Sequence, residues 1–155
     1  MIERMGAKRA GKAQKHMESV GNAEGITFNF RGRTGNSRMS HLLMHAAGLK
    51  SSEVQCNVAE ELFKAHFEEA RDIADLEVLG DVADRAGLGK TEMERYFESA
   101  KEGVCELDEE ARRVRDSEIK GVPHIIFEDG PHFDGAVDVQ DVFEALISLK
   151  TQLQV

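Results

Sequence analysis

The feature that most constrains the fold of this chain is the stretch Gly121-Val-Pro-His-Ile-Ile-Phe127, in which a proline opens a run that contains two β-branched residues and a phenylalanine. Proline has no N–H to give to a strand ladder, so it occurs at the start of a strand, on an edge or at a bulge. We therefore predict a strand that begins at Pro123. A turn at Asp129-Gly-Pro131 and a second run from His132 to Val137 predict the other half of a hairpin.

Size, composition and charge set the class of protein. The chain has 155 residues, of which 41% are hydrophobic and 32% charged, a composition typical of one globular domain with a core. It shows neither an apolar run of membrane-spanning length nor a secretory signal, so we expect a soluble protein of the cytoplasm. Its net charge of -9 argues against nucleic acid as a partner, because phosphate binding needs a cationic surface.

The two cysteines, Cys56 and Cys105, lie far apart in the sequence, and neither belongs to a Cys-x-x-Cys pair. Two isolated cysteines make neither a disulfide framework nor a zinc site, and they favour a reducing compartment. We expect each to be a small buried apolar residue.

Most of the chain has the spacing of amphipathic helices, interrupted by one strand pattern. Ile26, Phe28 and Phe30 alternate with polar residues and predict a half-buried strand over Gly25–Phe30. Cap residues and apolar periodicity predict the helices. These are a weakly amphipathic one over about 1–20, one over about 38–47 ended by Gly48, one opened by Ser52-x-x-Gln55, one from Asp75 to Gly87, one opened by Thr91-x-x-Glu94, one over Leu107–Ile119, and one from Asp138 to about Gln152.

The apolar positions of two helices suggest what they bury. The helix after Ser52 offers Val58, Leu62 and Ala65 with Phe63 or Phe67. The last helix is expected to bury its large apolar residues, namely Val139, Val142, Phe143, Leu146 and Ile147. This order of elements predicts an α/β fold, rich in helices, with a small mixed sheet and a helical insertion over about 38–119.

Polar motifs give weaker signals. The loop Arg31–Arg38 has glycines and arginines that could hold an anion, but it matches no phosphate-binding fingerprint, and we favour a connection that ends in an Asn36 or Ser37 helix cap. His41 and His45 have the i, i+4 spacing of metal ligands without a third ligand nearby, so we expect no metal.

Several segments, taken in order, resemble the DsbA-type thioredoxin superfamily, in particular its FrnE-like branch, whose relatives include kappa-class glutathione transferases and 2-hydroxychromene-2-carboxylate isomerases. The matching segments are Gly25–Phe30, Asn36–His41, Leu62–Phe67 with Asp72-Ile73, Leu79–Leu88, Gly121–Pro123 and Phe133–Ala136. The resemblance implies a single domain over residues 1–155 with an incomplete thioredoxin-like fold.

The resemblance also implies a site. Its Gly-Val-Pro loop would contain a cis bond before Pro123, although an ordinary trans-proline is the open alternative. Val122 and Pro123 would offer backbone groups to an extended peptide or to a thiol ligand such as glutathione. Asn36 and His41 would lie at the edge of the substrate groove.

One departure from the family is larger than these matches. Complete members begin with a strand that leads into Cys-x-x-Cys, or a Ser or Asn substitute, and this chain starts too late for either. We therefore expect no catalytic residue, little redox activity, and a vacant central position in the sheet. A rearranged N-terminal segment or a homodimer would fill that vacancy.

Three functions follow as alternatives. The first, which we prefer, is a thiol–disulfide oxidoreductase relative without its redox centre. The second is a non-enzymatic module that dimerises or accepts a strand from a partner. The third is a transferase or isomerase relative, in which glutathione contacts Val122 and the loop Arg31–Arg38.

Overall fold

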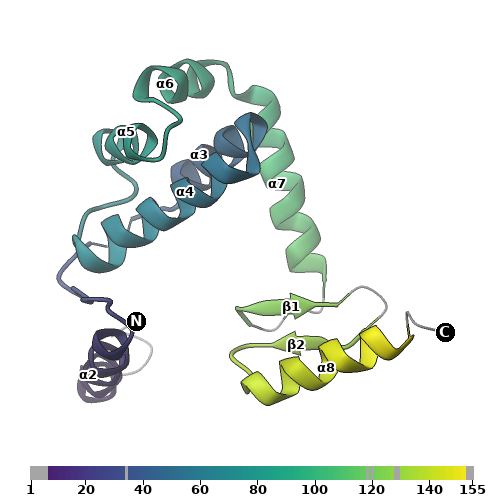
Figure 1. Cartoon of the computed structure of the whole chain (residues 1–155). Helices are drawn as coiled ribbons and strands as arrows, with labels where there is room; N and C mark the ends of the chain where they lie inside the picture. The colour runs from purple at the N-terminus through teal and green to yellow at the C-terminus, as the bar shows by residue number, and fades with distance from the viewer. Residues whose placement is uncertain (1–6, 34, 118, 120, 128–129, 153–155) are drawn as a thin grey trace. The chain divides into compact units, whose positions relative to one another are not determined.

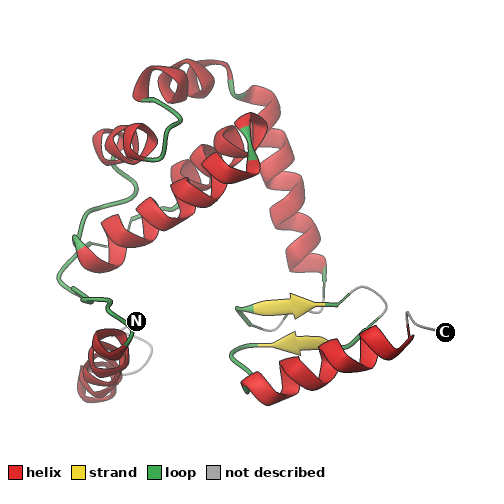
Figure 2. Ribbon diagram, viewed as in Figure 1, coloured by secondary structure: helices red, strands yellow, loops and turns green. Residues whose placement is uncertain are grey.

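A computed structural model describes residues 7–33, 35–117, 119, 121–127 and 130–152. The chain divides into two compact units, Met1–Leu107 and Asp108–Val155, and the boundary falls within helix α7 (Lys101–Asp116). Among the described residues, strands occur in the second unit alone (Figure 2). No helix among all the residues that the structure describes is long and apolar enough to cross a membrane.

The first unit is helical, and its elements are labelled in Figure 1. They are α2 (Ala7–Ala23), α3 (Arg38–Lys50), α4 (Ser52–Phe63), a π-helical turn η1 (Lys64–Glu68), α5 (Leu76–Arg85), α6 (Lys90–Ser99) and the beginning of α7. The predicted first helix is present from residue 7 onwards, and residues 1–6 lie outside the described part. The last predicted helix of the insertion begins earlier than expected, at Lys101 instead of Leu107.

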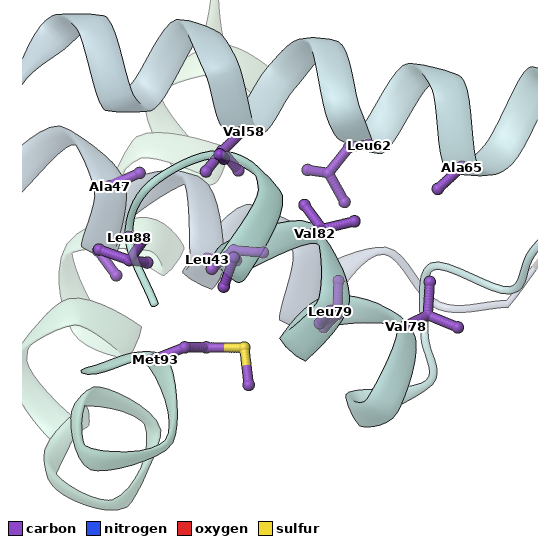
Figure 3. Close-up of a cluster of buried hydrophobic side chains, with 13 residues drawn as sticks. Leu43, Ala47, Val58, Leu62, Ala65, Val78, Leu79, Val82, Leu88 and Met93 are labelled. Carbon is purple, nitrogen blue, oxygen red and sulfur yellow. The ribbon is translucent and has the colours of Figure 1, made fainter. Parts of the chain in front are cut away.

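The core of this unit lies where α3, α4, α5 and α6 meet (Figure 3). Val58 and Leu62 of α4 are buried as predicted, with Ala65 one turn further on. The other three helices add large apolar residues to the cluster, among them Leu43, Leu79, Val82 and Met93. Phe63 and Phe67, which the pattern offered as further core residues, are exposed instead.

The junction between α3 and α4 differs from its prediction by a few residues. Ser51, not Ser52, caps α4, and its side chain accepts a hydrogen bond from the Val54 N–H at 3.1 Å. The Gln55 side chain donates to the Met44 carbonyl at 3.2 Å instead of closing a capping box. Gly48 does not end α3 as predicted but lies inside it, and a β-carbon there would collide with the Gln55 amide.

The ends of α5 are as predicted, whereas the start of α6 is not. The Asp75 carboxylate accepts from the Glu77 N–H at 2.8 Å, and Gly87 takes the positive φ of 85° that follows a helix end. Helix α6 begins at Lys90 instead of being capped by Thr91. The Asp84 carboxylate accepts from the Lys90 N–H at 2.5 Å.

The strand predicted over Gly25–Phe30 is wrong, because residues 26–29 are irregular. Their alternation of apolar and polar residues is real, but no strand pairs with them in the described structure. The Asn29 N–H donates instead to the Phe67 carbonyl at 2.6 Å, which ties the segment to η1.

The second unit contains the hairpin that the proline-opened stretch predicts. Strand β1 (His124–Ile126) starts directly after Pro123 and pairs antiparallel with β2 (His132–Asp134). Asp129 of the predicted turn lies outside the described residues, and the neighbouring Gly130 N–H donates to the Phe127 carbonyl at 3.0 Å. The helix-rich fold is confirmed, although this two-stranded sheet is antiparallel and not mixed.

The last helix, α8 (Val139–Gln152), starts after Asp138 as predicted. The Asp138 carboxylate accepts from the Gln140 N–H at 2.8 Å. The expected burial of its large residues is wrong, because Ala145 is buried whereas Val139, Phe143, Leu146 and Ile147 are exposed. Helix periodicity finds an apolar stripe, but it does not tell which part of the stripe another element covers.

Candidate functional site

The loop before β1 has the geometry that the resemblance implies, since the Val122–Pro123 peptide bond is cis. The Gly135 N–H donates to the Pro123 carbonyl at 2.7 Å and closes the loop onto the chain leaving β2. Gly135 has a positive φ of 81°, a conformation in which a β-carbon would be strained. The loop is therefore anchored at Pro123.

Val122 is presented to solvent by this anchored loop. Its residue surface is 88% exposed, and neither its N–H nor its carbonyl has a hydrogen-bond partner within residues 121–127 and the rest of the described chain. An exposed residue with a free donor and a free acceptor can bond an incoming extended chain.

A histidine lies one residue beyond the proline and is held across the hairpin. His124 Nδ1 lies 2.7 Å from Asp134 Oδ1, and the two residues are opposite each other in the strand register. The His124 ring also meets the ring of His132 edge to face, with centroids 5.8 Å apart. The contacts with Asp134 and His132 hold the imidazole of His124 in one orientation, one residue after the loop.

Asn36 and His41 lie in the other unit, at the start of α3. The Asn36 side chain accepts from the Arg38 N–H at 3.0 Å, which helps to begin the helix, and His41 is exposed. Their expected place at the edge of a substrate groove stays a prediction, as does the substrate role of Val122 and Pro123.

The loop Arg31–Arg38 is packed on an acidic residue. A β-carbon at Gly35 would stand 2.7 Å from a carboxylate oxygen of Asp72, so that carboxylate lies against the loop backbone. Asp72 also accepts from the Ala74 N–H at 2.9 Å. A fixed negative charge beside the loop disfavours a bound anion, in keeping with its interpretation as a connection. Thr34 of this loop lies outside the described residues.

The burial predicted for the two cysteines is wrong. Cys56 on α4 and Cys105 on α7 are both exposed and unpaired. Each cysteine lies on the polar face of its helix. The prediction considered only how often cysteine is buried and not its position on the helix. Among the described residues, no three histidine, cysteine or acidic side chains are grouped to hold a metal.

The structure also reveals a polar cluster that the sequence did not signal, formed by His45, Tyr96 and Glu106. His45 Nδ1 lies 2.7 Å from the Tyr96 hydroxyl, and its Nε2 lies 2.7 Å from a carboxylate oxygen of Glu106. When Nε2 carries the proton it donates to Glu106, and Nδ1 accepts from the tyrosine. The three residues come from α3, α6 and α7, so no local spacing joins them.

This cluster raises the pKa of Tyr96. Burial of the phenol is the larger cause, and the negative charge of Glu106 adds to it. Both disfavour the phenolate, so the neutral hydroxyl that bonds His45 is the stable form.

We expect Tyr96 to ionise above its usual pKa of 10.0 in the folded protein. Tyr96 is the single tyrosine of a chain without tryptophan, so phenolate absorbance during a pH titration reports this residue alone. Because the folded pKa is raised, stability falls as the pH rises through and above 10.0. The midpoint should return towards the ordinary value in urea, and Glu106→Gln should lower it. A folded midpoint at or below 10.0 would contradict the cluster.

The sequence of the whole chain was compared with known proteins and protein families. No curated protein matches the sequence significantly. A family model described as a DSBA-like thioredoxin domain matches residues 3–147, which include the hairpin, the cis bond and all the helices of the insertion. The chain therefore belongs to the DSBA-like thioredoxin domain family.

Proposed function

We propose that the chain is a FrnE-like member of this family that binds an extended peptide or a thiol-containing peptide ligand at the loop around Val122 and Pro123. The observation that carries the proposal is the backbone of Val122 beside the cis bond, which is bonded to no other residue that the structure describes. An extended ligand strand pairs through its main chain, so an exposed donor and acceptor on one residue supply the first two hydrogen bonds.

The same proposal assigns little thiol–disulfide exchange to these 155 residues by themselves. Efficient exchange needs an exposed thiolate and a second thiol within reach to resolve the mixed disulfide. The sequence contains no Cys-x-x-Cys pair, and its two cysteines are unpaired. The family relationship supports an oxidoreductase lineage within this proposal, and the feature of these residues that would serve it is the ligand-binding loop.

The test is a titration with reduced glutathione, which serves as a minimal thiol peptide, followed by amide NMR. We expect the Val122 amide to shift with saturation, and Val122→Pro, which removes that N–H, to weaken binding by about tenfold. Val139→Pro is the matched control. Val139 is also exposed, at 83%, and it stands at the first position of α8, where proline is tolerated.

The control separates a ligand contact from a general effect of proline. An unmoved Val122 amide at high glutathione and with an extended peptide would refute the proposal. Equal weakening by Val139→Pro would refute it as well. Insulin reduction should stay at the uncatalysed rate, and a clear catalysed rate would overturn the proposal that these residues carry out little thiol–disulfide exchange.

A second candidate function is a non-enzymatic module that pairs with another chain, as a homodimer or by strand addition. It is favoured by β1, which pairs on one side alone within the described residues and exposes Ile126. Unpaired edges with apolar side chains promote association. Sedimentation should then show a dimer that Ile126→Lys dissociates, and a monomer at all concentrations would refute it.

A further inference from the structure

A pocket of about 510 Å³ lies in the helical unit and is lined by residues that the proposed peptide site does not use. Its apolar wall, called here the aromatic groove, consists of Met17, Ile26, Phe28, Phe63 and Phe67. Met17 comes from α2, and Ile26 and Phe28 come from the irregular segment after it. Phe63 comes from α4 and Phe67 from η1. The groove therefore joins three parts of the unit.

Most of the apolar side chains of the aromatic groove are exposed to solvent. Phe63 is 59% exposed, and Met17, Ile26 and Phe67 are each exposed by more than a third. Single exposed apolar residues are ordinary, but a contiguous group at one pocket marks a binding surface.

The rings of the groove are held in place by contacts with one another. The Phe28 and Phe67 rings meet edge to face with centroids 6.1 Å apart, and Phe63 lies 6.2 Å from Phe67. Gly21 of α2 makes room for the Phe28 ring, since a β-carbon there would stand 2.5 Å from it. A surface ordered in advance loses less entropy on binding.

The rim of the groove is acidic. Glu60 and Glu68 line the pocket, and within the described residues neither has an ion-pair partner. Glu61 also lines the pocket but is paired with Arg85 at 2.9 Å, and elsewhere in the unit Glu92 is paired with Lys50 at 2.7 Å. Lys64 is the one basic residue among those that line the pocket. The free charge at the groove is thus negative, like that of the whole chain.

We propose that the aromatic groove binds a cationic segment of another protein, one that carries apolar side chains beside arginine or lysine. The apolar side chains cover Phe63 and Phe67, and the cations pair with Glu60 and Glu68 or lie over the exposed ring faces. An anionic membrane is disfavoured, because the carboxylates would meet lipid phosphates. This binding does not depend on the loop at Val122.

The test uses a short fluorescently labelled peptide of leucine, phenylalanine and arginine with the spacing of an amphipathic helix, and the same peptide with glutamate in place of arginine. We expect fluorescence anisotropy to show saturable binding of the arginine peptide and no binding of the glutamate peptide. Added salt should weaken the binding of the arginine peptide. Phe63→Ser and Glu60→Lys should each weaken it by about tenfold.

Two matched variants keep the test specific. Leu49→Ser removes an apolar side chain that is 69% exposed elsewhere, and Glu109→Lys reverses an exposed charge outside the pocket. Both should bind the basic peptide as the parent chain does. Equal binding of the two peptides, or equal loss in Leu49→Ser and Phe63→Ser, would overturn the proposal. A dimer that Phe63→Ser dissociates, with no peptide binding, would instead assign the groove to a second copy.

Discussion

Replacing Leu79 by alanine should lower the free energy of unfolding of the helical unit by about 2 to 5 kcal/mol, the range for large-to-small changes in a packed core. Leu79 is fully buried, and it belongs to the cluster that α5 shares with α3, α4 and α6 (Figure 3). The loss has two parts, because the removed methyl groups leave the apolar core and the remaining cavity is only partly closed by relaxation.

Urea unfolding monitored by the helical circular dichroism signal measures this change. Leu49→Ala is the matched control, since Leu49 is a leucine of the same unit with most of its surface in solvent, and its expected effect is about 0.5 kcal/mol or less. If both variants lost the same stability, Leu79 would not lie in a packed interior, and the arrangement of the four core helices would be wrong.

Local patterns predicted this core well. Val58 and Leu62 are spaced by four residues along α4, and one helix face carries both into the interior. Asp75 and Gly87 define α5 because their roles depend on the backbone immediately around them. Capping and periodicity are local properties, so sequence alone is enough to find them.

The errors arise where a distant partner decides the outcome. Residues 26–29 alternate as a strand does, but a strand exists only with a neighbour to pair with, and here Asn29 bonds Phe67 of η1. Phe63 follows the apolar pattern of α4 yet faces solvent at the aromatic groove, because no described element covers it. The width of a buried stripe is set by what packs on it, which periodicity does not contain.

The candidate site shows the same division. The resemblance pointed to Val122 and Pro123, and the cis bond is confirmed. The cluster of His45, Tyr96 and Glu106 went unseen, since its members are separated by as many as 61 positions in the sequence. A tertiary contact of that kind leaves no periodic signal, although burial and the charge of Glu106 raise the pKa of the one tyrosine.

Gly103 is the residue that makes this cluster possible, and replacing it by alanine should destabilise the unit by about 1 to 3 kcal/mol, the usual effect of overpacking. In an ordinary helix interior the same change is stabilising, by roughly 0.5 to 1 kcal/mol. Here an added β-carbon would overlap the Tyr96 hydroxyl and lie 3.4 Å from His45 Nδ1. The expected loss therefore comes from the hydroxyl, not from the helix.

A double-mutant cycle with Tyr96→Phe isolates that contact. Tyr96→Phe removes the hydroxyl and its hydrogen bond to His45, with an expected loss of about 1 kcal/mol. In this background Gly103→Ala should be much less destabilising, so the two changes should couple by about 0.5 to 3 kcal/mol. Urea unfolding of the four chains measures the coupling, and in the Gly103→Ala single variant the phenolate titration of Tyr96 should move as the hydroxyl leaves His45. Strict additivity would mean that the Tyr96 hydroxyl does not occupy the space above Gly103, and the interpretation of this cluster would then be wrong.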